Sequence, residues 1–301
     1  MTSITTAETV LSTDKLTRCY GKLTAVNEVS IHIPKGLIYG FLGMNGAGKS
    51  TLINMLMGKF SPTSGAITLQ GETVKVVRPD MRKKIGFVSQ EQHFYPWMRV
   101  LALGDFVSNF YPNWDQKEFL RLIEVLEIPT DRKIKQLSGG NKTKLALTLA
   151  LAINPEILIL DEPTTGLDPV ARREFMEAIV AQARNHNRTT FFSSHLVNEV
   201  EQCADVIGII HNGKLRYEGM LADLKDTTRE IIFDGPPPLD FLESAKIWVD
   251  ETIESGRRLI IQASTQKWSE LDADLNFEFT SKFLDLEDIF LACAKGNVAA
   301  V

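Results

Sequence analysis

The sequence predicts an α/β fold with a mostly parallel central sheet, and three observations lead to this prediction. A glycine-rich loop of the phosphate-binding type follows a short apolar stretch at 37–42. Apolar stretches of strand length recur at 85–89, 157–160, 189–193 and 206–210, with helical segments between them. Two adjacent carboxylates, Asp161 and Glu162, directly follow one of these strands. Such alternation is typical of a parallel sheet covered by helices on its faces.

Length and composition narrow the functional classes. The 301 residues, of which 44% are hydrophobic, suffice for one large domain and a smaller one. The net charge of −5 comes without a long basic run, so we expect no nucleic-acid partner. Three widely separated cysteines, Cys19, Cys203 and Cys293, indicate neither a disulfide framework nor a structural zinc site. No apolar run is long enough to cross a bilayer, so we expect any membrane span to belong to another chain.

The loop at 43–51 fits the phosphate-binding pattern G-x-x-x-x-G-K-[ST]. A buried strand is predicted before it, and after it apolar residues at helical spacing predict a helix that ends at Gly58. Backbone N–H groups of such a loop point at a phosphate, and the helix N-terminus adds partial positive charge. A chance glycine-rich turn is the alternative. We expect ATP to contact Gly43, Asn45, Gly46, Ala47, Gly48, Lys49, Ser50 and Thr51.

The expected chemistry at this loop is phosphoryl transfer. Lys49 would neutralise the outer phosphates, and the Ser50 hydroxyl would be an oxygen ligand of Mg²⁺. Asp161 would also bind Mg²⁺, directly or through water, while Glu162 would polarise the water that attacks the terminal phosphorus. An acidic pair that only caps the following helix is the alternative. The two carboxylates and the loop are expected at the same edge of the sheet.

The segments outside the phosphate loop and the acidic pair have different residue patterns, which predict different secondary structure. Residues 16–33 and 66–71 predict paired strands around the phosphate loop. From about 91 to 153 the pattern is helical, which indicates a helical insertion in the α/β core. After about Thr227 a strand-like stretch, three prolines at 236–238, a probable hairpin at 255–256 and a final helix near 284–294 predict a separate, small α+β domain at 228–301.

A further motif, Leu137-Ser138-Gly139-Gly140-Asn141, opens a helical stretch, although Ser138 could simply cap that helix. Taken in order, the motifs resemble the nucleotide-binding domain of ATP-binding-cassette (ABC) transporters over about residues 14–220. The resemblance implies a P-loop NTPase (RecA-like) core with an antiparallel β subdomain and a helical subdomain, together forming a nucleotide-binding domain at 14–225. It also implies a head-to-tail dimer in which Ser138, Gly139 and Gly140 contact the ATP held by the partner.

The resemblance assigns roles to further residues. Tyr20 matches the aromatic that stacks on adenine, and Gln90 matches the Q-loop glutamine, which contacts Mg²⁺ and the reacting phosphate. Asp168 matches the D-loop aspartate, and His195 the switch histidine near the γ-phosphate. Tyr20 could instead be an ordinary strand aromatic, Gln90 a plain loop amide and His195 a structural histidine. Asn141 stands where the family usually has glutamine, which puts only fine coupling in doubt.

The resemblance also implies partners and a location. A separately encoded membrane permease would receive the energy of ATP hydrolysis, and a second copy of the chain or a paralogous ATPase subunit would complete the dimer at the cytoplasmic face of the membrane. Thr164-Thr165-Gly166, the Tyr-Pro-x-Trp-Asp stretch at 111–115 and the C-terminal extension resemble the drug, bacitracin and lantibiotic-resistance exporters. A soluble ABC-type ATPase or a nucleotide-dependent regulator is the alternative. The transported substrate cannot be read from the sequence.

Two hypotheses concern contacts outside the nucleotide site. The aromatic-rich segment 91–114 follows Gln90 directly, so we expect it to dock on the permease and to respond to nucleotide state. A plain helical core is the alternative interpretation. The C-terminal segment 228–301 carries no recognisable chemistry, and we expect it to steady the homodimer or to contact the permease.

Overall fold

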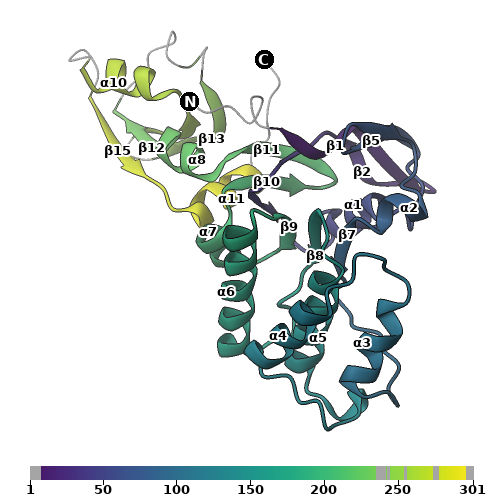
Figure 1. Ribbon diagram of the computed structural model, residues 1–301. Coiled ribbons are helices and arrows are strands. Elements are labelled where there is room, and N and C mark those ends of the chain that lie inside the picture. Colours follow the sequence, from purple (N-terminus) through teal and green to yellow (C-terminus); the bar gives the residue numbers. More distant parts are fainter. Residues whose placement is uncertain (1–7, 235–241, 243–244, 254–255, 274–277, 296–301) are drawn as a thin grey trace.

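A six-stranded sheet forms the centre of the molecule in the computed structural model of the chain, which describes residues 8–234, 242, 245–253, 256–273 and 278–295 (Figure 1). Its strand order is β11-β10-β4-β9-β8-β7. All neighbours pair in parallel except β10 and β11, so the mostly parallel sheet is confirmed. The strands are β4 (Ile38–Leu42), β7 (Ile85–Val88), β8 (Ile157–Asp161), β9 (Thr189–Ser194), β10 (Val206–His211) and β11 (Lys214–Met220).

Strand β4 shows why the sheet is buried on both faces. All five of its residues are buried, and alternate side chains enter different cores: Ile38 and Leu42 pack in one, Tyr39 and Phe41 in the other. This alternation follows from the two-residue period of a strand. The helices that flank the sheet are α1 (Lys49–Leu56), α5 (Gly139–Ala152), α6 (Pro169–His186), α7 (Val197–Cys203) and α8 (Leu221–Thr227).

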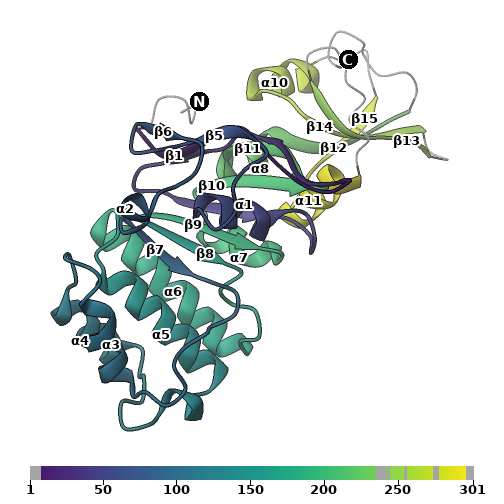
Figure 2. The ribbon, with the colours of Figure 1, turned by 90° about the vertical axis from the view of Figure 1, so that its right-hand side faces the viewer.

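A second, antiparallel sheet lies on the side of α1 (Figure 2). Its order is β2-β1-β5-β6, and β3 pairs with β1. Leu52, Ile53 and Leu56 of α1 belong to the same buried cluster as Leu11 and Ile67 of this sheet. The phosphate-loop helix is therefore fixed between two sheets. The elements are β1 (Thr9–Tyr20), β2 (Leu23–Val29), β3 (His32–Pro34), β5 (Ser64–Leu69), β6 (Glu72–Val74) and the short helix α2 (Pro79–Arg82).

The segment after β7 is helical, as expected. It contains α3 (Val100–Ser108), α4 (Gln116–Val125) and a 3₁₀ turn at Ile134–Gln136, and it leads into α5. Asp115 caps α4 by accepting a hydrogen bond from the N–H of Glu118. Phe119 is fully buried and packs with Leu145 of α5 in a local hydrophobic core. This core joins the helices into one subdomain at the lower end of Figure 1.

The C-terminal segment forms a four-stranded antiparallel sheet with the order β13-β14-β12-β15. Strands β13 and β14 pair antiparallel on either side of the predicted hairpin, whose residues 254–255 lie outside the described residues, as do the prolines at 236–238. Trp268 and Phe233 are buried in a small core of this sheet. The elements are β12 (Thr228–Phe233), β13 (Lys246–Ile253), β14 (Gly256–Gln262), α10 (Thr265–Ala273), β15 (Phe279–Phe283) and α11 (Leu286–Lys295).

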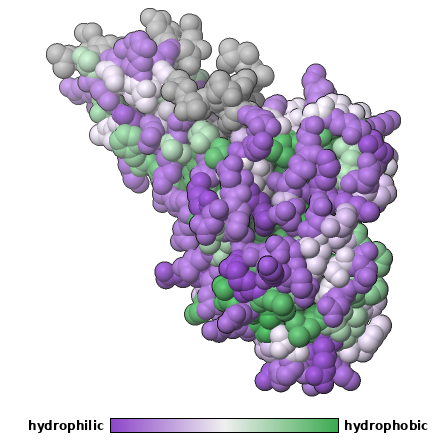
Figure 3. All heavy atoms as spheres, in the orientation of Figure 1, coloured by the Kyte–Doolittle hydropathy of each residue, from purple (hydrophilic) through white to green (hydrophobic). Residues whose placement is uncertain are grey.

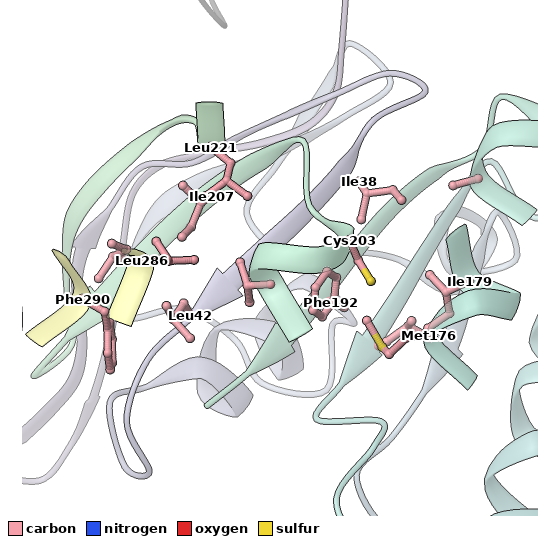
Figure 4. Packing of buried hydrophobic residues seen from close by; sticks show 14 of the residues in the cluster. Ile38, Leu42, Met176, Ile179, Phe192, Cys203, Ile207, Leu221, Leu286 and Phe290 are labelled. Atoms are coloured by element: carbon pink, nitrogen blue, oxygen red, sulfur yellow. The ribbon is translucent and has the colours of Figure 1, made fainter. Parts of the chain in front are cut away.

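Helix α11 joins this C-terminal segment to the rest of the chain. Leu286 and Phe290 lie in the same buried cluster as Ile207 of β10 and Leu221 of α8 (Figure 4). The sheet begins at Thr228, the residue at which we expected a second domain. The division into two domains remains a prediction, and the shared cluster shows that the two parts have one continuous hydrophobic core.

Candidate nucleotide site

The phosphate loop connects β4 to α1 at the carboxyl edge of the central sheet. Gly46 and Gly48 both have positive φ, at +78° and +109°, a region that side chains with a Cβ rarely occupy. A Cβ at Gly48 would lie 2.5 Å from the carbonyl oxygen of Ala25 on β2. The next residue, Lys49, begins α1. Glycine at position 48 is thus required both for the turn and for the close approach of the neighbouring sheet.

Lys49 is buried and makes short contacts with both sides of the site. Its Nζ donates to the carbonyl oxygens of Gly43 at 2.7 Å and Met44 at 3.1 Å. The same Nζ lies 2.9 Å from Oε1 of Glu162 at the end of β8. Only 3% of the Lys49 side chain and 8% of the Glu162 side chain are exposed, so water screens this ion pair weakly. The loop and the acidic pair therefore meet at one edge of the sheet, as expected.

Asp161 lies beside Ser50 and Ser193. Oδ1 of Asp161 accepts hydrogen bonds from the Ser50 hydroxyl at 3.1 Å and from the Ser193 hydroxyl at 2.9 Å. Ser193 Oγ also accepts from the backbone N–H of Glu162 at 3.0 Å, which links β9 to the end of β8. Burial raises the pKa of the Asp161 carboxyl, although both hydroxyls and Lys49 oppose the shift. A buried carboxylate of this kind gains stability when a cation binds to it.

Glu162 occupies an unusual backbone conformation. Its φ of +43° lies in the left-handed region, which costs a non-glycine residue about 1–2 kcal/mol. Oε2 of Glu162 accepts a hydrogen bond from Thr165 Oγ1 at 3.3 Å and lies 3.0 Å from Nδ1 of His195. Burial alone would raise the pKa of Glu162, but Lys49 and His195 together outweigh burial and lower that pKa. The carboxylate is thus kept ionised between two nitrogen groups.

The oxygen atoms of Ser50 on α1 and Asp161 at the end of β8 suit a magnesium ion. Ser50 offers a hydroxyl and Asp161 a carboxylate, and Mg²⁺ prefers a few such oxygens together with phosphate and water. Within the described part of the chain no cluster of three or more His, Cys, Asp or Glu side chains could hold a metal by itself. A metal bound here would therefore take some of its ligands from Ser50 and Asp161 and the others from a bound phosphate and water. Gln90 lies exposed two residues after β7.

The other predicted site residues lie apart from the pair formed by Lys49 and Glu162. Tyr20 is 41% exposed at the end of β1, where the guanidinium of Arg18 lies 4.7 Å from its ring centroid. Ser138 caps α5 by accepting from the N–H of Asn141 at 3.2 Å. Asp168 caps α6 through two backbone N–H groups, at 3.0 and 2.9 Å.

The residues Ser138, Gly139 and Gly140 at the start of α5 lie close to the start of α6. A Cβ at Gly140 would lie 3.8 Å from Cβ of Ala171, and a Cβ at Gly139 would have no neighbour within 4 Å. Gly139 therefore opens toward free space, while Gly140 is half-buried against Leu167 and Ala171. The position of Gly139 is accessible to a partner molecule.

Several polar residues of the site were not predicted from the sequence. Ser193 and Thr165 bond the two carboxylates directly, and Ser194, Thr164 and Glu199 form a second group behind them. The available signal was the run of hydroxyl residues beside each motif: two threonines after Glu162-Pro163 and two serines before His195. For Glu199 the only signal was an acidic residue between apolar positions of a short helix.

Comparison with known proteins identifies the family. The model of the ABC transporter family matches residues 26–165. The bacitracin transport ATP-binding protein BcrA of Bacillus licheniformis is 37% identical over 227 residues, which make up 74% of this chain and 74% of that protein. The chain belongs to the ABC transporter ATP-binding proteins. It is therefore an ATPase subunit that binds and hydrolyses ATP to drive transport.

Other relatives extend the comparison. The lantibiotic transport ATP-binding protein SrtF of Streptococcus pyogenes is 37% identical over 69% of this chain and 90% of its own. An uncharacterized ABC transporter ATP-binding protein of Bacillus subtilis, YcbN, is 31% identical over 96% of this chain and 98% of its own, so that likeness includes the C-terminal segment. A solved dimeric bacterial ABC transporter cassette has a TM-score of 0.64 and 25% identity, covering 70% of this chain and 98% of that cassette. These likenesses confirm the fold class and place the chain in the predicted branch of the family.

Proposed function

We propose that the chain hydrolyses ATP with Glu162 as the general base, in a head-to-tail dimer that drives a separate membrane permease. The observation that carries this proposal is the chain of contacts from Lys49 through Glu162 to His195, at 2.9 and 3.0 Å. A carboxylate that is kept ionised and buried can accept a proton from a water molecule. Lys49 and the loop N–H groups supply positive charge where the transferred phosphoryl group accumulates negative charge.

The ion pair of Lys49 and Glu162 suggests how binding and chemistry are ordered. The outer phosphates of ATP carry more negative charge than one carboxylate, so they compete with Glu162 for the Lys49 ammonium. Glu162 then retains its contact with His195 and becomes free to accept a proton. Ser50 and Asp161 would hold Mg²⁺, which neutralises phosphate charge when bound, and Gln90 would reach the same region from the end of β7.

The second half of the site would come from the partner subunit. Ser138 already caps α5, and the exposed Gly139 after it leaves the helix N-terminus open to an anion. In a head-to-tail dimer these donors would lie opposite the phosphate loop of the other copy, with Tyr20 against the adenine and Asp168 at the interface. The dimeric cassette among the solved relatives supports this arrangement.

A groove beside the helical subdomain suits the permease. It has a volume of about 780 Å³ and lies between β7, the segment 92–94 and helix α5. Phe110, which is 58% exposed, lines this groove. Ring contacts continue from Phe110 through Phe106 to Tyr95 and Trp97, which are 46% and 65% exposed. Apolar side chains also gather on the lower part of the surface in Figure 3, where the helical subdomain lies. We therefore propose that the segment 91–114 docks on the permease.

The structure sharpens the test of this docking. Phe94 is only partly exposed and packs against two buried clusters, so it contributes to the fold as well as to the surface. Tyr95→Ala combined with Trp97→Ala is the cleaner variant. We expect this double variant to bind ATP normally and to lose co-purification with the permease. Leu23→Ala, an exposed apolar residue on β2, serves as the control; undiminished co-purification of the double variant would refute docking.

We further propose that transport is outward and that the chain works at the cytoplasmic face of the cell membrane. The relatives named for bacitracin, lantibiotic and linearmycin support export, because two are named for transport of such compounds and one for resistance. Within the described residues no helix has the length and hydropathy of a membrane span. Expression with its permease in a sensitive host, followed by measurement of antibiotic accumulation, tests the direction: lowered accumulation supports export and raised accumulation refutes it.

The central experiment compares wild type with Glu162→Gln. ATP hydrolysis is measured at steady state while dimerisation with Mg²⁺ and ATP is followed by size-exclusion chromatography. We expect Glu162→Gln to lose at least about 100-fold in kcat and to accumulate as an ATP-bound dimer. Hydrolysis by the variant at the wild-type rate would exclude Glu162 as the base.

A further inference from the structure

Behind the two catalytic loops lies a buried carboxylate that the mechanism above does not use. Glu199 is the third residue of α7 and is 6% exposed. Its Oε1 accepts a hydrogen bond from Thr164 Oγ1 at 2.5 Å, and its Oε2 accepts one from Ser194 Oγ at 2.6 Å. One carboxylate oxygen thus binds the loop after Glu162, and the other binds the last residue of β9. Thr164 and Ser194 are themselves buried, at 3% and 2% exposure.

The two segments that Glu199 joins carry the proposed base and the proposed switch histidine. Thr164 follows Glu162 by two residues and begins the turn that leads to Asp168. Ser194 directly precedes His195, and its Oγ also accepts from the N–H of Leu196 on the other side of that histidine. The side chains of Glu162 and His195 meet in front of these anchors, at 3.0 Å. A change at Glu199 would accordingly shift both partners of that contact.

Arg172 of α6 completes the arrangement. Its Nε lies 3.5 Å from Oε1 of Glu199, and its Nη2 donates to the carbonyl oxygen of Leu167 at 3.5 Å. A buried carboxylate needs partners that offset its lost hydration. Two hydroxyl donors and a nearby guanidinium supply them here.

We propose that Glu199 is a positioning residue that holds the loop after Glu162 and the end of β9 before His195 in register for ATP hydrolysis. The proposal rests on the roles proposed for Glu162 and His195. Both carboxylate oxygens of Glu199 are engaged by Thr164 and Ser194, so Glu199 acts on Glu162 and His195 through the neighbouring backbone. Its effect should therefore fall on the rate of the chemical step and spare the binding of ATP.

Glu199→Gln tests the proposal with the least change of shape. The amide keeps only one acceptor oxygen, so it cannot accept from both hydroxyls in the present geometry. We expect kcat to fall at least about tenfold and KM for ATP to change less than about twofold. A fall in kcat without a comparable change in KM indicates that an interaction needed in the transition state has been lost. Glu201→Gln is the matched control because Glu201 lies on the same helix but pairs with Lys225 at its surface; it should keep the wild-type kcat.

Two further variants decide the matter if Glu199→Gln fails to fold. Thr164→Val and Ser194→Ala each remove one hydroxyl, and each should lower kcat several-fold. Thr164→Ser, which keeps the hydroxyl, should restore most of the rate. Full activity of Glu199→Gln, or of Thr164→Val and Ser194→Ala together, overturns the proposal.

Glu162→Gln is measured in parallel to separate the two proposals. If Glu162→Gln loses activity while Glu199→Gln does not, only the positioning role of Glu199 fails. If Glu162→Gln stays active, Glu162 is not the general base.

Discussion

Nζ of Lys49 and Oε1 of Glu162 lie 2.9 Å apart, so the lysine of the phosphate loop is paired with the proposed general base. The two residues are 113 positions apart in the sequence: Lys49 begins α1, and Glu162 directly follows β8. Their contact stabilises the site but also occupies both groups. In the proposed mechanism, binding of a triphosphate exchanges this ion pair for contacts with phosphate, which would link nucleotide binding to activation of Glu162.

Replacement of Lys49 should change the response of stability to pH. The pKa of Glu162 is lowered from 4.5 in the folded chain, with Lys49 as the main opponent of burial. A lowered pKa contributes stability above the unfolded value, and this contribution is lost as the pH falls from about 5 through the folded pKa. Lys49→Met should therefore lose ATP binding and show a shallower fall of Tm in acid. Differential scanning fluorimetry across this range checks the prediction, and Lys83→Met, an exposed lysine, should retain the wild-type slope.

Asp161→Asn should stabilise the protein in the absence of nucleotide. Burial raises the pKa of Asp161, so its ionised form costs folding free energy at neutral pH, and that cost disappears as the carboxyl is protonated in acid. The amide retains an acceptor oxygen for Ser50 or Ser193 without the charge. We expect a higher Tm at pH 7, a smaller difference at lower pH and a weaker rise of Tm with Mg²⁺ and ATP. An unchanged response to Mg²⁺ and ATP would argue against Asp161 as a metal ligand.

Alanine at two neighbouring glycines should separate backbone strain from steric overlap. Gly46 and Gly48 both have positive φ, but only at Gly48 would a Cβ meet another backbone atom, the oxygen of Ala25 at 2.5 Å. Gly46→Ala should cost about 1–2 kcal/mol from strain alone. Gly48→Ala should cost distinctly more, because the neighbouring strand must also move. Urea unfolding of both variants measures the difference, and equal losses would contradict the role of Ala25.

How far the sequence predicts this molecule differs between its parts. The strand before the phosphate loop and the helix after it depend on local patterns, and β4 and α1 lie where residues 37–58 predicted them. The contacts of Ser193 and Glu199 depend on which strand ends adjoin, and a single serine or glutamate carries no signal of that. The change of residue pattern after Thr227 predicts a separate domain, but it does not indicate that Phe290 packs in the core of the central sheet. Side-chain partners across the sheet edge therefore had to come from the structure.

Truncation of Phe290 tests the continuous core. This residue is 6% exposed and packs in the cluster that contains Ile207 of β10. Phe290→Ala should cost about 3–5 kcal/mol and lower the Tm of a single transition that ATP also shifts. Phe279→Ala, in the small core of the C-terminal sheet, should perturb the cassette less. Calorimetry that resolves two transitions, with only one sensitive to ATP, would show that the C-terminal segment unfolds by itself.

The burial of α11 against β10 has a consequence for synthesis. The residues proposed to bind phosphate lie near position 49, yet the face of the sheet behind them is covered in part by Leu286 and Phe290. While the chain grows on the ribosome, the phosphate loop emerges more than 230 residues before its last covering helix. An incomplete chain would expose Ile207 and Leu221 to chaperones and proteases. Full packing behind the phosphate loop thus awaits the synthesis of α11.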